Sequence, residues 1–172
     1  MTSDPLSWRR GSRASFTLGA DPGVYALFLR SGANLPGVDP AEQGLLYIGK
    51  ADGHGGFKRR CHFKGGTRNH SPRKSLAVLL MQELSLVPVL IRKPTAPNTW
   101  ALERHSEERL SKWMHSNLDL AIELRTDPRV VERELVAKLA PPLNLNLCKQ
   151  SVGHRKIAAA RGTVLASLEL ST

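Results

Sequence analysis

The chain has 172 residues, enough for one domain with a hydrophobic core, and its 41% of apolar residues is ordinary for a globular protein. Lys and Arg outnumber Asp and Glu by 25 to 15, and the net charge of +10 with a pI near 10.2 favours a polyanionic partner such as nucleic acid. No stretch approaches the roughly 20 apolar residues of a membrane helix, and two cysteines, Cys61 and Cys148, are too few for a disulfide framework. We therefore expect no membrane or targeting segment, and a reducing, cytoplasmic location.

The positive charge is concentrated in one part of the chain. Residues 50–74 hold eight Lys or Arg against a single acidic residue, Asp52, which is a net +7 of the total +10. If this segment binds DNA, release of counterions from the phosphates makes the affinity depend steeply on salt. The alternative is a solvated basic loop with no partner.

The first half of the chain predicts two buried strands and a short basic helix. The first 20 residues lack periodicity and predict an irregular lead-in, of which only residues 14–16 are expected to pair with a strand. Residues 23–30 and 45–49 are compact apolar runs of strand length, joined by a long loop rich in glycine and proline. A glycine-rich corner then leads into a predicted helix over residues 56–64.

The second half predicts three further helices and one strand, followed by a C-terminal helix. Ser71 is the expected N-cap of an amphipathic helix, prolines leave residues 86–98 as a short strand or loop, and residues 100–116 show helical spacing. Residues 118–124 alternate apolar and acidic residues as a half-exposed strand does. A helix beginning at Asp127 and Pro128 is expected to end at the Pro141-Pro142 pair, and the last helix begins near residue 152.

One acidic residue of this penultimate helix is expected to face the core. Glu132 shares a face with apolar residues three, four and seven positions further on, whereas Glu134 points outward and can pair with Lys138. A carboxylate on an inward face needs a cation. Two interpretations stay open: an ion pair with an arginine, or a ligand to Mg²⁺, which prefers oxygen donors.

Two tripeptides of similar form contain both tyrosines of the chain: Gly23-Val24-Tyr25 and Tyr47-Ile48-Gly49. The basic helix follows the second tripeptide, and further on Glu132 precedes the proline pair and Asn144 in the segment ERELVAKLAPPLN. In this order the residues resemble the GIY-YIG nuclease family over residues 23–146. The long loop between the tyrosines departs from compact family members.

The resemblance implies an α/β (α+β) fold, with a small central, mainly antiparallel sheet of three strands flanked by helices. It also implies a nuclease domain over residues 21–148, preceded by the lead-in of residues 1–20 and followed by a helical extension over residues 149–172.

The resemblance further implies catalytic roles for Tyr25, Tyr47, Arg60, His62 and Glu132. Tyr25 is the first choice for the base that activates water, Tyr47 orients water or phosphate, and Glu132 holds Mg²⁺, with Mn²⁺ as an alternative. A phenol with an ordinary pKa of about 10 needs activation to serve as a base at neutral pH. Arg60 would stabilise charge on the phosphate; His70 and His54 stay open as alternatives to His62.

The implied substrate contacts come from Lys50, Arg59, Lys64, Arg68 and Asn144. Lys50 can hold a phosphate or lower the pKa of a neighbouring phenol, Arg59 is the alternative to Arg60, and Asn144 positions groups near the site. The implied activity is metal-dependent hydrolysis of DNA, more readily double-stranded than single-stranded, with a homodimer on DNA as one route to double-strand cleavage. The alternatives are a nucleic-acid-binding protein without catalysis and a basic structural or protein-interaction domain.

Overall fold

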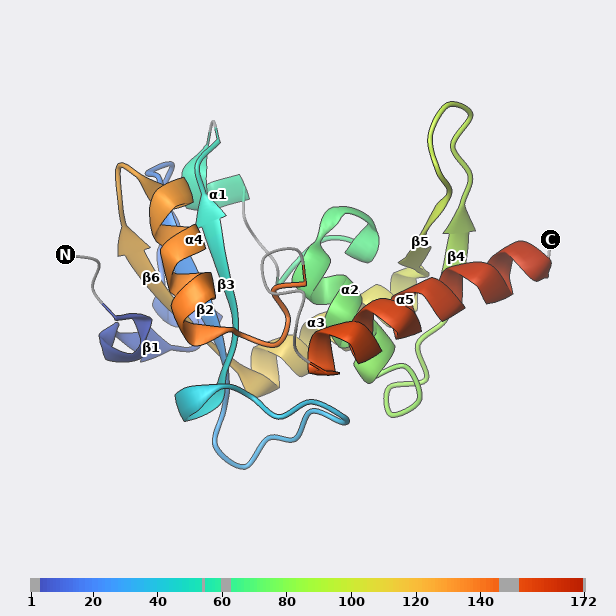
Figure 1. The fold of residues 1–172 in the computed structure, drawn as a ribbon, viewed down its shortest axis with the longest axis horizontal. Helices are drawn as coiled ribbons and strands as arrows, with labels where there is room; N and C mark the ends of the chain where they lie inside the picture. Colours follow the sequence, from blue (N-terminus) through green and yellow to red (C-terminus); the bar gives the residue numbers. More distant parts are fainter. Residues whose placement is uncertain (1–3, 54, 60–62, 146–151, 172) are drawn as a thin grey trace.

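The computed structural model describes residues 4–53, 55–59, 63–145 and 152–171; Arg60, His62, His54 and both cysteines lie outside these ranges. Its centre is an antiparallel four-stranded sheet in the order β1-β6-β2-β3 (Figure 1). The strands are β1 (Arg10–Gly11), β2 (Gly23–Leu29), β3 (Leu45–Ala51) and β6 (Leu118–Leu124). The predicted α/β class and the three expected strands of the antiparallel sheet are confirmed.

The fourth strand comes from the lead-in. Arg10 pairs with Ala121 and Gly11 with Leu120, so β1 extends the sheet by two residues beside β6. The expected pairing at residues 14–16 is wrong, because Arg13–Ser15 forms a 3-10 turn instead. A two-residue strand is too short to show the alternation that marks a strand in a sequence.

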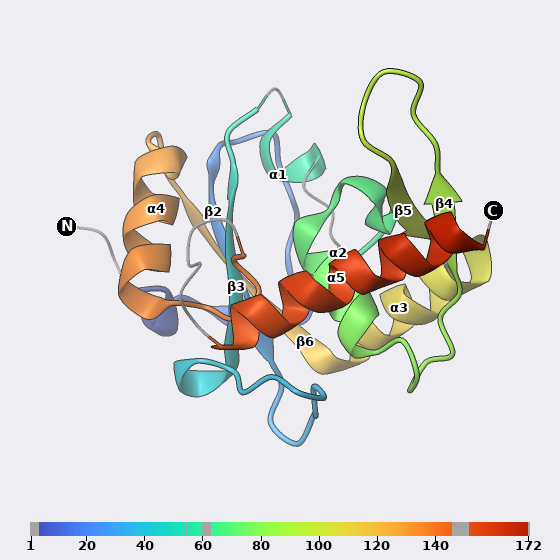
Figure 2. The same ribbon diagram turned by 45° about the vertical axis from the view of Figure 1, so that its right-hand side comes forward.

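Helices cover both faces of the sheet (Figure 2). One face packs against α4 (Pro128–Leu139), where alternate β2 residues such as Ala26 and Phe28 meet Leu135 and Val136. The other face, which includes Leu27, packs into the larger core built by the remaining helices. These are α1 (Gly56–Arg59), α2 (Ser71–Leu79), α3 (Arg104–Asn117) and α5 (Val152–Leu170).

The start and end of α4 follow from its sequence. Asp127 is the cap residue, and Pro128 takes a first-turn position at which a missing N–H costs nothing. At the other end Ala140 adopts a left-handed conformation (φ 44°, ψ 51°), and its N–H bonds to the Val136 carbonyl. Two prolines follow and turn the chain back toward the sheet.

Three predicted boundaries are wrong. Thr99–Leu102 is strand β5, which pairs with β4 (Pro88–Ile91), so α3 begins at Arg104 and not at residue 100. The helical spacing of apolar residues continues back to Trp100. Residues 99–102 nevertheless form a strand, because they pair with β4, and the local sequence does not reveal this pairing. The helix expected over residues 56–64 does not extend to 63 and 64, which lie in a turn and bend. Ser71 is the first residue of α2, and the cap position belongs to His70.

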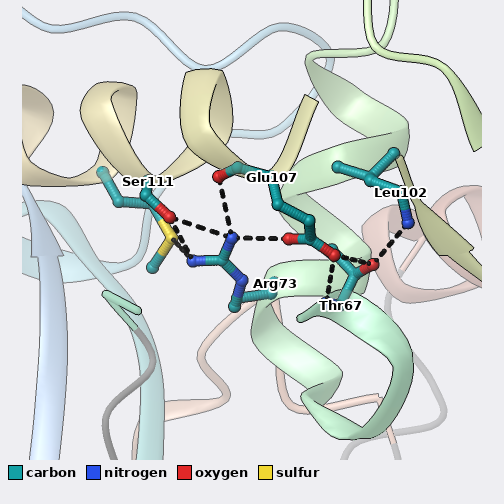
Figure 3. A network of polar contacts seen from close by, with 6 residues as sticks. Thr67, Arg73, Leu102, Glu107 and Ser111 are labelled. Atoms are coloured by element: carbon teal, nitrogen blue, oxygen red, sulfur yellow. Dashed lines mark hydrogen bonds and ion pairs between the residues drawn. The ribbon is translucent and has the colours of Figure 1, made fainter. Parts of the chain in front are cut away.

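A buried polar network holds α2 against α3 (Figure 3). The Arg73 side chain, 0% exposed, donates from Nη2 to the Glu107 carboxylate at 2.7 Å and from both terminal nitrogens to the Ser111 hydroxyl at 3.1 Å. The other Glu107 carboxylate oxygen accepts from the Thr67 backbone N–H and hydroxyl, and the Thr67 hydroxyl in turn accepts from the Leu102 N–H at 2.9 Å. One carboxylate of α3 therefore connects the segment before α2 and α2 itself, and Thr67 links this network to the end of β5.

The C-terminal helix α5 lies across α2 and the β4–β5 hairpin (Figures 1 and 2). Its Ile157 is buried in the larger core, and the Trp100 indole N–H donates to the Arg161 carbonyl at 3.2 Å. The division of the chain after residue 148 stays a prediction. Among the described helices, none combines the length and apolarity needed to cross a membrane.

Candidate active site

The two tyrosines lie on the same face of neighbouring strands. Tyr25 of β2 pairs in register with Gly49 of β3, and Leu27 pairs with Tyr47, so both phenol rings stand on the face opposite α4. Their centroids are 6.0 Å apart and the rings are tilted by 40°. The two tripeptides are therefore brought together by strand register.

The glycines of both tripeptides make this arrangement sterically allowed. A Cβ atom at Gly49 would overlap the Tyr25 hydroxyl and ring, which lie across β3 at this point. A Cβ atom at Gly23 would overlap the Glu123 carbonyl oxygen and the Phe57 ring. Since real Cβ atoms do not approach so closely, any larger residue would displace an aromatic side chain of the site.

The two phenols differ in access. Tyr25 is only 3% exposed and packs edge-on against Phe57 at a centroid distance of 6.4 Å. Tyr47 is half-buried, and its side chain lines a cavity that also contains the Glu132 carboxylate.

Lys50 and Glu132 meet on the α4 side of the same edge strand. The Lys50 ammonium donates to Glu132 Oε2 at 3.0 Å, and their side chains are 29% and 13% exposed. Glu132 thus faces inward, as its helical position predicts, and the cation beside it is a lysine instead of the arginine expected from an ion pair. A carboxylate in this position is shielded from bulk water but still open to a ligand.

A second ion pair connects α4 to the end of β3. Arg129, one turn before Glu132, pairs with Asp52 directly after the strand. Burial raises the pKa of Asp52, but the hydrogen bond from Arg129 and the charge of Lys50 together lower it by more than burial raises it. The pKa of Asp52 therefore lies below the usual range. The two pairs fix the distance between α4 and the edge strand.

Asn144 closes the open edge of β3. Its carboxamide oxygen accepts from the Ile48 N–H at 2.9 Å, and its amide nitrogen donates to the Ile48 carbonyl at 2.7 Å. The Leu143 N–H also donates to the Leu46 carbonyl at 2.9 Å. The segment after α4 therefore runs beside β3 almost as a further strand, with a side chain taking the place of a backbone ladder.

We predict that Asn144→Ala lowers the free energy of unfolding by about 2–4 kcal/mol, because it leaves both polar groups of the buried Ile48 backbone without their partner. Urea unfolding measures the change. Asn69→Ala, at an exposed asparagine, is the matched control and is expected to change stability by less than about 0.5 kcal/mol. Equal midpoints for both variants would contradict the role assigned to Asn144.

These segments surround a cavity of about 230 Å³ at the sheet edge. Four of the predicted site residues line it together: Tyr47, Lys50, Glu132 and Asn144. Ser71, the first residue of α2, also lines the cavity, although the sequence does not predict it as a site residue. No local pattern marks Ser71, because it reaches the cavity only through the packing of α2.

The remaining predicted site residues either lie away from this cavity or fall outside the residues that the structure describes. Arg60 and His62 fall outside the described residues, as does His54; α1 ends at Arg59, whose side chain is likewise not described. Lys64 and Arg68 are exposed, and neither lines the cavity beside β3. Arg68 and His70 instead line a neighbouring basic cavity.

The donor atoms around the cavity suit a hard divalent cation. Three of the residues that line it, Glu132, Tyr47 and Ser71, carry an oxygen at the end of the side chain. Within the described ranges, no three His, Cys, Asp or Glu side chains are grouped closely enough to hold a metal ion together. A site with one carboxylate fits Mg²⁺, which commonly completes its coordination with water and substrate phosphate.

Comparison with known proteins identifies the family. A search of curated proteins and a search of solved structures each found no match. The family model described as the GIY-YIG catalytic domain matches residues 23–162, which include both tyrosine tripeptides, α4 and the start of α5. Because this match spans most of the chain, the protein belongs to the GIY-YIG family of nucleases.

Proposed function

We propose that the protein is a metal-dependent DNA endonuclease that hydrolyses phosphodiester bonds at the cavity beside β3. The observation that carries this proposal is the meeting of Tyr47, Lys50 and Glu132 around one cavity, since a phenol, an ammonium and a carboxylate together can move a proton, neutralise a phosphate and bind a cation. A protein that only binds nucleic acid has no need of a carboxylate in a basic cavity, because it would repel phosphate.

Glu132 would hold the metal ion, Mg²⁺ or alternatively Mn²⁺, which supplies charge stabilisation at the phosphate when bound. With Glu132 engaged in this way, the Lys50 ammonium no longer neutralises the carboxylate. It can then pair with a phosphate oxygen or stabilise a neighbouring phenolate. Lys50, Glu132 and Tyr47 all line the same cavity, so we expect Lys50 to leave Glu132 for a phosphate or phenolate by rotation of its side chain.

The tyrosines divide between a contact role and a supporting role. The family resemblance puts Tyr25 first as the base. Access to the cavity instead favours Tyr47, which lines it, whereas Tyr25 is buried. We therefore assign proton transfer from water to the phenolate form of Tyr47, which Lys50 would stabilise, with Tyr25 positioning its ring. Arg60 or Arg59, and His62, stay proposed partners of the phosphate from the basic segment, with Lys64 and Arg68 as contacts to the flanking DNA.

Conservative substitution of each tyrosine separates these roles. We expect Tyr47→Phe to lower the cleavage rate at saturating DNA by about 10²–10⁴-fold, the range of a lost general base, and Tyr25→Phe by less than about tenfold, because the ring packing is kept. Single-turnover cleavage measures both, with circular dichroism as the check on folding. The reverse order of effects would return the base to Tyr25.

Cleavage of short labelled substrates tests the proposed activity itself. Duplex DNA, single-stranded DNA and RNA of one sequence are incubated with the purified protein in Mg²⁺, Mn²⁺ or EDTA. We expect DNA products in Mg²⁺ and Mn²⁺, fastest on the duplex, and none in EDTA. Tight binding without products on any substrate would favour a non-catalytic binder; faster cleavage of RNA would reassign the substrate.

A single cavity hydrolyses one strand in each encounter. Cutting both strands therefore requires a second protomer on the DNA or two successive nicks. Sizing of the protein on duplex DNA, in EDTA to prevent cleavage, distinguishes a homodimer from a monomer. The proposed place of action is the cytoplasm, in keeping with a sequence that has only two cysteines.

A further inference from the structure

A second and larger cavity adjoins the catalytic one. It has a volume of about 610 Å³, against about 230 Å³ for the cavity at β3, and it lies where the start of α2 meets α5. Ser71 and Leu145 line both cavities, so the two adjoin each other. A strand bound in one cavity can therefore extend into the other.

The lining of this basic cavity is cationic. Its ionisable residues come from the start of α2 and from one face of α5: Arg68, His70, Lys74, His154, Arg155 and Arg161. No acidic residue and no Phe, Tyr or Trp occurs among the described residues that line it. The first residue of α2 also lies here, and a helix N-terminus carries a partial positive charge.

The two innermost cations are held by neutral partners. Lys74 is only 7% exposed; its ammonium donates to the Thr99 hydroxyl at 2.6 Å and lies 5.1 Å from the centre of the Trp100 ring. The Arg161 guanidinium donates to the Ser71 hydroxyl at 3.3 Å. In the described part of the chain, no carboxylate forms an ion pair with either residue. Among the described residues, their charges are thus not neutralised by a carboxylate.

The pKa values of Lys74 and Arg161 also indicate that an anion would be bound favourably here. Burial, followed by the nearby charges of Arg161 and Lys93, lowers the pKa of Lys74 to about 8, and burial lowers the pKa of Arg161. Such shifts mean that the protonated groups are held at an electrostatic cost. An anion placed between them relieves that cost.

We propose that the basic cavity is a second phosphate subsite, which takes an internal backbone phosphate of the substrate strand next to the bond being hydrolysed. This inference rests on the proposed nuclease function. The volume is that of a small-molecule site and admits a nucleotide unit instead of a bare ion. The lack of an aromatic platform in the described lining favours contact with phosphate oxygens over base stacking, so the subsite positions DNA without reading its sequence.

DNA binding measured in EDTA tests the subsite without cleavage. We expect Arg161→Gln to weaken binding of a duplex about tenfold and to reduce the slope of log K against log salt by about 0.9, the value for one lost phosphate contact. Arg155→Gln, at an exposed position, is expected to act in the same direction and keeps the test valid if the Arg161 variant does not fold. Arg104→Gln, an equally charged change at an exposed residue of α3, is the matched control with unchanged affinity and slope.

Two oligonucleotides that differ only in a 5′-hydroxyl or a 5′-phosphate distinguish binding of an internal phosphate from binding of a terminal one. Equal weakening for strands with a 5′-hydroxyl and a 5′-phosphate supports an internal phosphate. Weakening confined to the phosphorylated strand, or inorganic phosphate competing as well as the oligonucleotide, overturns that assignment.

The two proposals fail separately. If the wild type cleaves DNA but the Arg161 and Arg155 variants bind with the affinity and slope of Arg104→Gln, the subsite is refuted and the nuclease stands. If the wild type cleaves nothing but those two variants lose the expected slope, the phosphate subsite is supported and the nuclease is refuted.

Discussion

Replacing Glu132 by glutamine is expected to slow Mg²⁺-dependent cleavage of a short DNA duplex by at least about 10³-fold. The change keeps the size of the side chain but removes the only carboxylate that lines the described part of the cavity. Glutamine still offers one carbonyl oxygen, but it has no negative charge to hold a divalent cation. The rate is measured under single-turnover conditions, with saturating Mg²⁺ and with protein in saturating excess over DNA, so that weaker DNA binding does not enter.

The matched control is Glu134→Gln, two residues further along the same helix and exposed. It removes the same charge from α4 and is expected to leave the rate within about twofold. Glu132 is only 13% exposed, but Lys50 is 29% exposed and can turn to solvent, so Glu132→Gln should cost about 1–2 kcal/mol of stability. A folded Glu132→Gln variant that cleaves at the wild-type rate would show that the catalytic site lies elsewhere.

The largest effect on stability is expected at Glu107. Glu107→Ala leaves the Arg73 guanidinium buried without its carboxylate and removes the acceptor of two Thr67 hydrogen bonds (Figure 3). Breaking a buried pair from one side costs about 3–5 kcal/mol, a large share of the 5–15 kcal/mol of a typical domain. Urea unfolding followed by circular dichroism measures the loss.

Glu108→Ala provides the comparison, because Glu108 is exposed and its ion pairs in the described part of the chain are with its helical neighbours Arg104 and His105. It is expected to change the free energy of unfolding by less than about 0.5 kcal/mol. Since α2 begins at Ser71, which lines the proposed catalytic cavity, the Glu107 variant is also expected to weaken DNA binding at temperatures where it is still folded. Equal stability of the two variants would mean that the network does not hold α2 in place.

The sequence predicts those parts of the fold that have a local pattern. The apolar runs around Tyr25 and Tyr47 and the alternation from Leu118 mark the three long strands, and helical spacing puts Glu132 on the inward face of α4. The ladder between β2 and β3 then explains why the two tripeptides meet. The positions of these strands and the orientation of Glu132 therefore follow from local sequence patterns alone.

The missed features depend on distant partners. Strand β1 exists only because β6 accepts two residues of the lead-in, and β5 replaces a predicted helical turn because β4 pairs with it. Lys50 becomes the partner of Glu132 because β3 is an edge strand lying against α4. The basic cavity forms only where α5 returns to α2, and a residue such as Arg161 has no local signal that connects it to Lys74.

Nicking of supercoiled plasmid DNA is the most direct test of the central claim, that this cavity hydrolyses phosphodiester bonds with a divalent cation. Wild-type protein is incubated with plasmid in Mg²⁺, in EDTA, and in EDTA followed by excess Mg²⁺, beside the Glu132→Gln variant. We predict open-circular product in Mg²⁺, none in EDTA, recovery on restoring Mg²⁺, and none with the variant. Equal nicking in EDTA, or by the variant in Mg²⁺, would contradict the account.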